Sequence, residues 1–139
     1  GQAYLELENT SSMTITTNTD TLVTFTNVFR QNGTGLTLDG KDNGTITVAS
    51  STNGFYCCTA VCQWSFNATG TRESFLLRNA SYRVAWSVLP APHTGNQTTS
   101  ITATTYMLTS GSTMQFRVWQ TSGGDLTLSA IRLYMGRVW

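Results

Sequence analysis

Three cysteines have the most distinctive chemistry in this chain, and all lie within residues 54–66, which read GFYCCTAVCQWSF. If this stretch is a β-strand, Cys58 and Cys62 lie on one face, about 13 Å apart, and Cys57 lies on the other. A disulfide requires Cα atoms within about 7 Å of each other, and the spacing CCxxxC is not that of a zinc site. We therefore predict free thiols. A bridge between two chains through Cys57 is the alternative.

The two cysteines on the shared face are expected to act as small apolar side chains inside the protein. The rest of that face is also apolar: Tyr56, Ala60, Trp64 and Phe66. We expect this face to point into the core. Thiols that stay unpaired favour assembly in a reducing compartment.

The other groups that could do chemistry are dispersed along the sequence. The single histidine, His93, lies in the loop of residues 90–99, and no nucleophile-elbow motif accompanies it. The seven acids form no evident glycosidase pair. Residues 38–44, LDGKDNG, lack the alternating oxygen ligands and the distal glutamate of a calcium loop, and a tight Asn-Gly turn explains them better. We predict a protein without catalytic activity, bound metal or cofactor.

Charge is scarce in this chain. Only 11% of the residues are charged, against about a quarter in ordinary soluble domains. Threonine and serine, 39 of 139 residues, take the place of charge. No basic stripe supports nucleic-acid binding, and no apolar run approaches the roughly 20 residues that a membrane-spanning helix needs. The low charge favours a protein that covers part of its surface by forming an oligomer; a monomeric β-sandwich is the alternative.

The elements that would position these residues are strands throughout. Apolar and polar residues alternate with period 2, turn signals rich in Asn and Gly separate the runs, and no segment has helical periodicity. Strands arrive every 8–12 residues, a spacing typical of an all-β sandwich or jelly roll in a single domain, residues 1–139. The expected strands are residues 3–7, 13–17, 22–29, 35–38, 45–49, 54–66, 73–78, 82–89, 100–108, 113–121 and 126–138.

The order of these features over residues 22–138 resembles the C1q/TNF-like jelly-roll family. LVTFTNVFRQNGTGLTL is similar to that family's opening strand and Asn-Gly turn, and LTLSAIRLYMGRV to its closing strand. SITATTYMLTSGSTMQFRVWQTSG resembles its late hairpin, with Leu108 and Gly111 matching and Ser112 in place of the usual aspartate. GTITVASSTNGFYCCTAVCQWSF carries the most specific match, at Gly44, Ile46, Val48, Gly54, Phe55 and Tyr56.

The resemblance implies an antiparallel two-sheet jelly roll of about ten strands that forms a tight parallel homotrimer. It also implies that the sheet holding both terminal strands faces the trimer axis, so that residues 113–121 and 126–138 lie partly at the subunit interface. In the first of these strands, Met114, Phe116 and Val118 should face the core. That leaves Arg117 and Trp119 toward a partner chain.

In the last strand the apolar positions change face near Ala130, which predicts a β-bulge or an apolar interface. Arg132 and Tyr134 are the other residues that we expect at the trimer interface. Residues 1–21 are expected to form an N-terminal strand segment that could join a shaft. Since the chain begins with Gly1 rather than Met, we expect a processed product or the tip of a longer protein.

The first functional hypothesis is a trimeric receptor-binding or capping head domain of a phage or viral fibre or spike. Such a domain would be assembled in the host cytoplasm, would sit on the virion surface, and would bind a host cell-surface glycan or protein. Exposed aromatic side chains such as Trp86 or Trp119 could stack on sugar rings. The alternatives are a secreted C1q/TNF-like ligand module and a purely structural oligomerisation, capsid or spore-surface subunit.

Glycosylation bears on the secreted alternative. The chain contains six Asn-x-Ser/Thr sequons, where composition alone gives roughly two or three. Turn chemistry explains Asn32 and Asn43, which precede turn glycines. The unpaired cysteines favour the interpretation without glycans.

Overall fold

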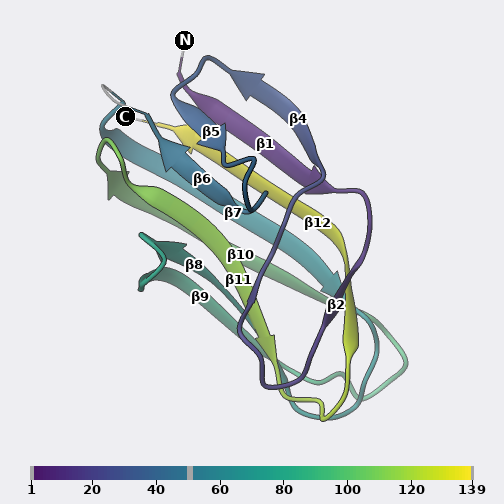
Figure 1. Cartoon of the computed structure of the whole chain (residues 1–139). Helices are drawn as coiled ribbons and strands as arrows, with labels where there is room; N and C mark the ends of the chain where they lie inside the picture. The colour runs from purple at the N-terminus through teal and green to yellow at the C-terminus, as the bar shows by residue number, and fades with distance from the viewer. Residues whose placement is uncertain (1, 50–51, 139) are drawn as a thin grey trace.

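The computed structural model describes residues 2–49 and 52–138, and the described residues form strands and loops without any helix (Figure 1). None of them therefore belongs to a helix that could cross a membrane. The strands are β1 (Tyr4–Asn9), β2 (Met13–Ile15), β3 (Thr21–Leu22), β4 (Asn27–Asn32), β5 (Leu36–Leu38), β6 (Thr45–Val48), β7 (Gly54–Trp64), β8 (Thr71–Arg78), β9 (Tyr82–Pro90), β10 (Thr98–Leu108), β11 (Thr113–Gln120) and β12 (Leu126–Arg137).

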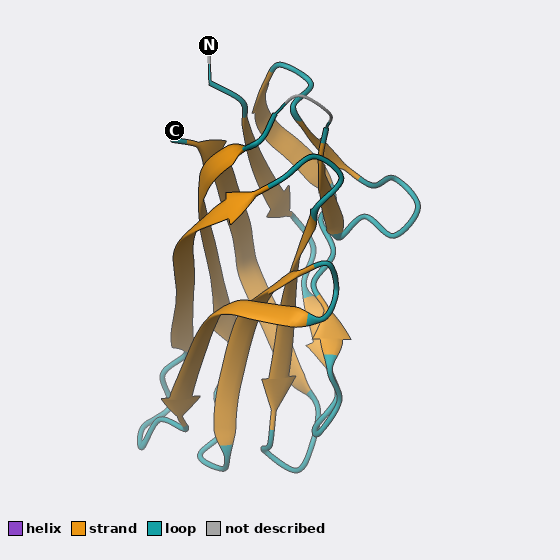
Figure 2. Cartoon of the chain, turned by 90° about the vertical axis from the view of Figure 1, so that its left-hand side faces the viewer, coloured by secondary structure: helices purple, strands orange, loops and turns teal. Residues whose placement is uncertain are grey.

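The strands form two antiparallel sheets that pack face to face (Figure 2). One sheet has the order β10-β7-β12-β1-β4, with β2 also paired to β12. It contains both terminal strands, and we call it the terminal-strand sheet. The opposite sheet has the order β5-β6-β11-β8-β9, with β3 also paired to β11. The predicted all-β, two-sheet antiparallel sandwich is confirmed, and residues 2–49 and 52–138 form twelve strands where about ten were expected.

The core follows from period-2 alternation on long strands. Along β7, inward residues are buried and outward residues are at least partly exposed. Tyr56, Cys58, Ala60, Cys62 and Trp64 are all buried, so the predicted core face is confirmed, and the three cysteines are free thiols. The prediction was wrong for Phe66. The strand ends at Trp64, and Phe66 is 44% exposed in the loop that follows.

A β-bulge in β12 moves the buried side chains from one set of positions to the other. Leu126 and Leu128 are buried before it, and Ile131 and Leu133 are buried after it. Between them Ala130 takes a φ of 49°, and the register of β12 on β7 shifts. The bulge predicted near Ala130 is therefore confirmed.

The expected single strand over residues 22–29 is in fact two short strands in different sheets. β3 pairs with β11 in the opposite sheet, whereas β4 pairs with β1 in the terminal-strand sheet. Between them the backbone N–H of Val23 donates to Phe116 and that of Phe25 donates to Asn43. Val23 and Phe25 are buried, so their alternation reflects core packing while the chain crosses between the sheets.

Polar groups inside the sandwich are mostly satisfied. Ser74 and Thr102 share a hydrogen bond of 2.7 Å between the sheets, and Trp64 Nε1 donates to the Ser100 hydroxyl at 3.1 Å. Arg72 is fully buried, and its guanidinium donates to carbonyl oxygens of the loop before β8, including those of Asn67 and Thr69. Burial lowers the pKa of Arg72. These carbonyls satisfy much of its hydrogen-bonding capacity inside the fold.

The turn at Gly70 gives a first test of the fold. Gly70 has a φ of 77°, and a Cβ built on it would lie 2.2 Å from the carbonyl oxygen of Thr121. Gly123 has a φ of 91° with open space around it. We expect Gly123→Ala to lower the free energy of unfolding by about 1 kcal/mol through backbone strain alone. We expect Gly70→Ala to lower it by about 3 kcal/mol or more, because a clash with backbone adds to the strain. Urea unfolding at one protein concentration measures both, and equal losses would contradict this turn geometry.

The buried thiols give a second test. Burial raises the pKa of Cys58 to about 12, with a smaller contribution from the neighbouring Cys57, and burial likewise raises the pKa of Cys62 to about 12. Because the thiolate is the reactive form, we expect a maleimide at pH 8 to label at most one cysteine of the native chain, Cys57. In denaturant all three should be labelled, as counted by mass spectrometry. Two or three labels on a chain that keeps its native circular dichroism would contradict the predicted core face of β7.

Candidate functional site

The outer face of the terminal-strand sheet, the face turned away from the opposite sheet, is the most unusual surface of the chain. It carries large hydrophobic side chains that are 38–60% exposed: Phe29, Phe55, Ile101, Met107 and Tyr134. They come from β4, β7, β10 and β12. A set of this size on one sheet face marks an interaction surface more often than scattered exposed residues do.

The strand registers place the side chains of this face in rows across the sheet. Because residues paired across antiparallel strands point to the same side, neighbouring strands continue each row. One row holds Ile101, Val61, Arg132 and Glu8, and the next holds Ala103, Thr59, Tyr134 and Glu6. The β10 end of the rows is apolar or small, and the charges gather at the β1 end.

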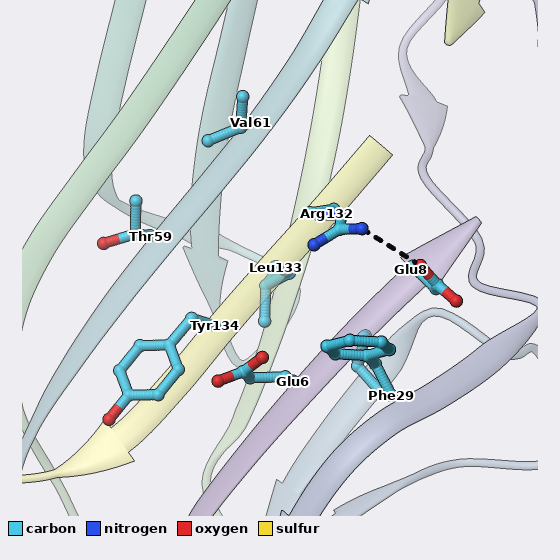
Figure 3. A pocket seen from close by; sticks show the side chains of 9 residues that line it. Glu6, Glu8, Phe29, Thr59, Val61, Arg132, Leu133 and Tyr134 are labelled. Atoms are coloured by element: carbon cyan, nitrogen blue, oxygen red, sulfur yellow. Dashed lines mark ion pairs between the residues drawn. The ribbon is translucent and has the colours of Figure 1, made fainter. Parts of the chain in front are cut away.

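The charged end of these rows surrounds a hollow of about 260 Å³ (Figure 3). Arg132 Nη2 lies 3.6 Å from Glu8 Oε2, and Asn27 Nδ2 donates to the other oxygen of Glu8 at 2.9 Å. The guanidiniums of Arg132 and Arg30 lie 5.2 and 5.3 Å from the centroid of the Phe29 ring. Because Glu6 also lines the hollow, two acids and two arginines balance one another, so the hollow can be covered without burying net charge.

The four residues predicted at a trimer interface do not lie together. Arg132 and Tyr134 are exposed and line the hollow. Arg117 and Trp119 are half-buried on β11, which belongs to the opposite sheet, and Arg117 Nη1 pairs with Asp20 Oδ1 at 3.2 Å. Alternation along a strand tells which residues share its face. It does not tell in which sheet the strand lies. Arg117 and Trp119 lie in the opposite sheet, and Arg132 and Tyr134 lie in the terminal-strand sheet.

Sequence reasoning missed Phe29, Thr59 and Val61 as members of this face. All six residues of β4 are exposed or half-exposed, so the strand has no alternation that would orient Phe29. Phe29 also lies opposite a register shift between β4 and β1. Thr59 and Val61 lie on the mixed face of β7. That face is part of a wider surface because β10 and β12 pair with β7 on its two sides, and this pairing is not encoded in the pattern of β7 itself.

The residues considered for catalysis or metal binding have ordinary structural environments. His93 is exposed in the loop between β9 and β10. Asp42 Oδ1 accepts hydrogen bonds from the backbone N–H groups of Gly44 and Thr45, as a turn-forming aspartate does. Burial acts to raise the pKa of Asp42, but hydrogen bonds from the Thr45 hydroxyl and these N–H groups outweigh it and lower the pKa. Within residues 2–49 and 52–138, no three His, Cys, Asp or Glu side chains cluster closely enough to hold a metal ion.

Comparison with known proteins finds similarity in structure and none in sequence. No protein-family model matches the sequence, and no curated protein resembles it. Among solved structures, crystal structures of murine APRIL at pH 5.0 and pH 8.0 superpose with TM-scores of 0.76 and 0.74. Each is 14% identical and is matched over 99% of this chain and 100% of its own.

The structure of Eiger TNF from S. frugiperda superposes with a TM-score of 0.65 at 14% identity. The match covers 99% of this chain and 92% of that one. At this identity the likeness concerns the fold and not the activity. The chain therefore has a TNF-like jelly-roll fold, as the resemblance of residues 22–138 implied.

Proposed function

We propose that this chain is a head domain that assembles as a homotrimer through the outer face of its terminal-strand sheet and binds a receptor with its remaining surface. The observation that carries the proposal is the exposure of Phe29, Phe55, Ile101, Met107 and Tyr134 on that one face. A stable interface covers about 800 Å² on each partner and has an apolar centre with a polar rim. This face supplies both kinds of surface, apolar residues of β7 and β10 and, beside them, the balanced charges of the hollow.

A trimer is the assembly that the C1q/TNF-like resemblance implies, with the sheet of both terminal strands toward the axis. The candidate site lies on that sheet. Its two paired charges, Glu8 and Arg132, satisfy each other within one chain. A second copy can therefore cover them without supplying a counter-charge. The low overall charge supports the same proposal, because a surface buried between subunits needs few charges.

In such a trimer the opposite sheet and the loops at the ends of the sandwich face outward. We place receptor binding there, and the receptor would be a host cell-surface glycan or protein. The setting that suits the free thiols is a phage or viral fibre or spike, assembled in the host cytoplasm and displayed on the virion surface. Binding, and not catalysis, is the role that these surfaces support.

A secreted C1q/TNF-like ligand module is the second candidate, favoured by the similarity to murine APRIL and Eiger TNF. The sequons at Asn79 and Asn96 are exposed and open to modification. Asn9 is 8% exposed, and its amide donates to the carbonyl of Thr24 at 2.8 Å, so this sequon is not available in the folded chain. Secretion from insect or mammalian cells followed by intact-mass measurement distinguishes the two candidates, because glycans would raise the mass above 15.2 kDa.

The assembly is tested by placing a charge at the centre of the face. We expect the unaltered chain to scatter light as a particle of about three chain masses. Thr59 is half-buried between Ala103 and Tyr134 in its row. We expect Thr59→Arg to give a folded monomer, or to shift the dissociation constant upward by about a hundredfold or more, because the arginine would be buried without a partner.

Thr47→Arg is the matched control. Thr47 is equally half-buried, but it lies on the outer face of the opposite sheet, where it pairs with Thr37 and Thr113. This variant should remain trimeric. An unaltered chain that is monomeric at micromolar concentration would refute the proposed assembly. So would a Thr59→Arg variant that remains a trimer.

A further inference from the structure

We propose that the outer face of the β8–β9 hairpin binds a sugar that carries a carboxylate, with the sugar ring stacked on Trp86 and the carboxylate held by Arg83. The hairpin forms one edge of the opposite sheet (Figure 1). This inference rests on the receptor-binding role proposed above and names the chemical class of the receptor. It requires no residue of the terminal-strand sheet.

Trp86 is an exposed aromatic side chain that is nevertheless held in place. It is 59% exposed, and its indole N–H donates to Glu73 Oε1 at 3.2 Å. Across the strands it pairs with Phe75, which is 2% exposed even though it points away from the core. A ring that is already fixed loses little conformational entropy when a ligand stacks on it. The remaining lone pairs of the Glu73 carboxylate can accept hydrogen bonds from sugar hydroxyl groups.

Arg83 supplies a positioned cation beside this ring. Its guanidinium carbon lies 4.1 Å from the centroid of the Phe75 ring and 4.9 Å from that of Trp86. These two stacking contacts fix the guanidinium plane. Among the described residues, none accepts a hydrogen bond from Arg83 and none forms an ion pair with it. Its N–H groups therefore remain available to a carboxylate, for which the guanidinium fork has the matching geometry.

A second arginine, Arg78, lies next to the turn of the same hairpin, but its side chain is on the inner face of the sheet, because it pairs across the strands with the buried Met114. The guanidinium carbon of Arg78 lies 5.4 Å from the centroid of the Tyr82 ring and 5.6 Å from that of Tyr106. Its Nε is buried and has no hydrogen-bond partner in the described residues. The ion pairs among the described residues involve Arg117 and Arg132. Neither Arg78 nor Arg83 takes part in one of them. On the outer face, Arg83 is therefore the arginine beside Trp86 that is open to a ligand, and Arg78 adds positive charge from the inner side of the turn.

Charge complementarity selects an acidic ligand over a neutral one, and the mixture of groups selects a sugar. A neutral sugar or an apolar peptide would leave Arg83 without a partner. A nucleic-acid backbone would meet the negative Glu73 beside Trp86. A saccharide ring offers a face for the indole, hydroxyl groups for Glu73 and, where it is acidic, a carboxylate for Arg83.

The test uses the whole chain and defined probes. A printed array of saccharides ending in N-acetylneuraminic acid, glucuronic acid or neutral galactose identifies the preferred class. The methyl glycoside of the preferred acid is then titrated while NMR follows the indole N–H of Trp86. We expect acidic sugars to bind in preference to galactose and this resonance to shift. We expect Arg83→Gln and Trp86→Ala each to weaken binding about tenfold or more, and Trp86→Phe to retain part of it.

Lys41→Gln is the control, because Lys41 is also an exposed cation but lies between β5 and β6, at the other edge of the same sheet and away from the proposed trimer interface. It should leave sugar binding unchanged. Thermal unfolding of each variant shows that the fold is intact, and Arg83→Lys, which keeps the charge but loses the fork, should bind more weakly than the unaltered chain.

The result that overturns the proposal is a folded chain that binds no acidic sugar, or binds galactose equally well. Binding that survives both Arg83→Gln and Trp86→Ala, or that a DNA oligonucleotide reproduces equally, would show attraction by charge alone and would also overturn it. Light scattering on the same samples separates this proposal from the assembly. A trimer that binds no acidic sugar refutes only the sugar site, and a monomer that binds one refutes only the trimer.

Discussion

The antiparallel pairing of β1 with β12 is the contact on which the rest of this structure depends. It joins the two ends of the chain in the middle of one sheet, with Leu5 opposite Met135 and Leu7 opposite Leu133, all four buried. The chain between these two strands, residues 10–125, starts and ends at this pair. It includes all the strands of the opposite sheet, which packs over the pair. Because the side-chain period of a strand is two, the same register also points Glu6, Glu8, Arg132 and Tyr134 outward together.

The bulge at Ala130 makes this arrangement compatible with the rest of β12. Before it, Leu126 and Leu128 pack inward where the strand pairs with β2 and the end of β7. Without the extra residue, Arg132 and Tyr134 would be directed into the core and Ile131 and Leu133 would be exposed. One residue in a left-handed conformation thus exchanges the faces of the strand. It allows a single twelve-residue strand to close the sandwich at one end and to form an outer interaction surface at the other.

Much of this could be predicted from the sequence, for a physical reason that also sets the limit. Alternation is a property of one strand, and it correctly oriented Cys58 and Cys62 in β7, Met114, Phe116 and Val118 in β11, and the change of face in β12. Sheet membership depends on contacts between distant segments, so the pattern could not reveal that Arg117 and Arg132 lie in different sheets. For the same reason residues 22–29 resembled one strand, although the chain passes from the opposite sheet to the terminal-strand sheet there. Phe29 sits at an irregular register that no local pattern encodes.

The distribution of arginines explains why the two outer faces differ in what they can bind. In a chain with few charges, each unpaired one is conspicuous. Arg72 donates to carbonyl oxygens in the interior through both terminal nitrogens of its guanidinium, and Arg132 and Arg117 are paired with acids on either face. The hollow on the terminal-strand sheet therefore presents balanced charge next to apolar surface, which suits a second copy of the same chain. Arg78 and Arg83 are held by aromatic rings and not by carboxylates. Aromatic rings fix the position of a cation and leave its hydrogen-bonding edge open, so the β8–β9 hairpin keeps a directed positive charge that an external carboxylate can satisfy.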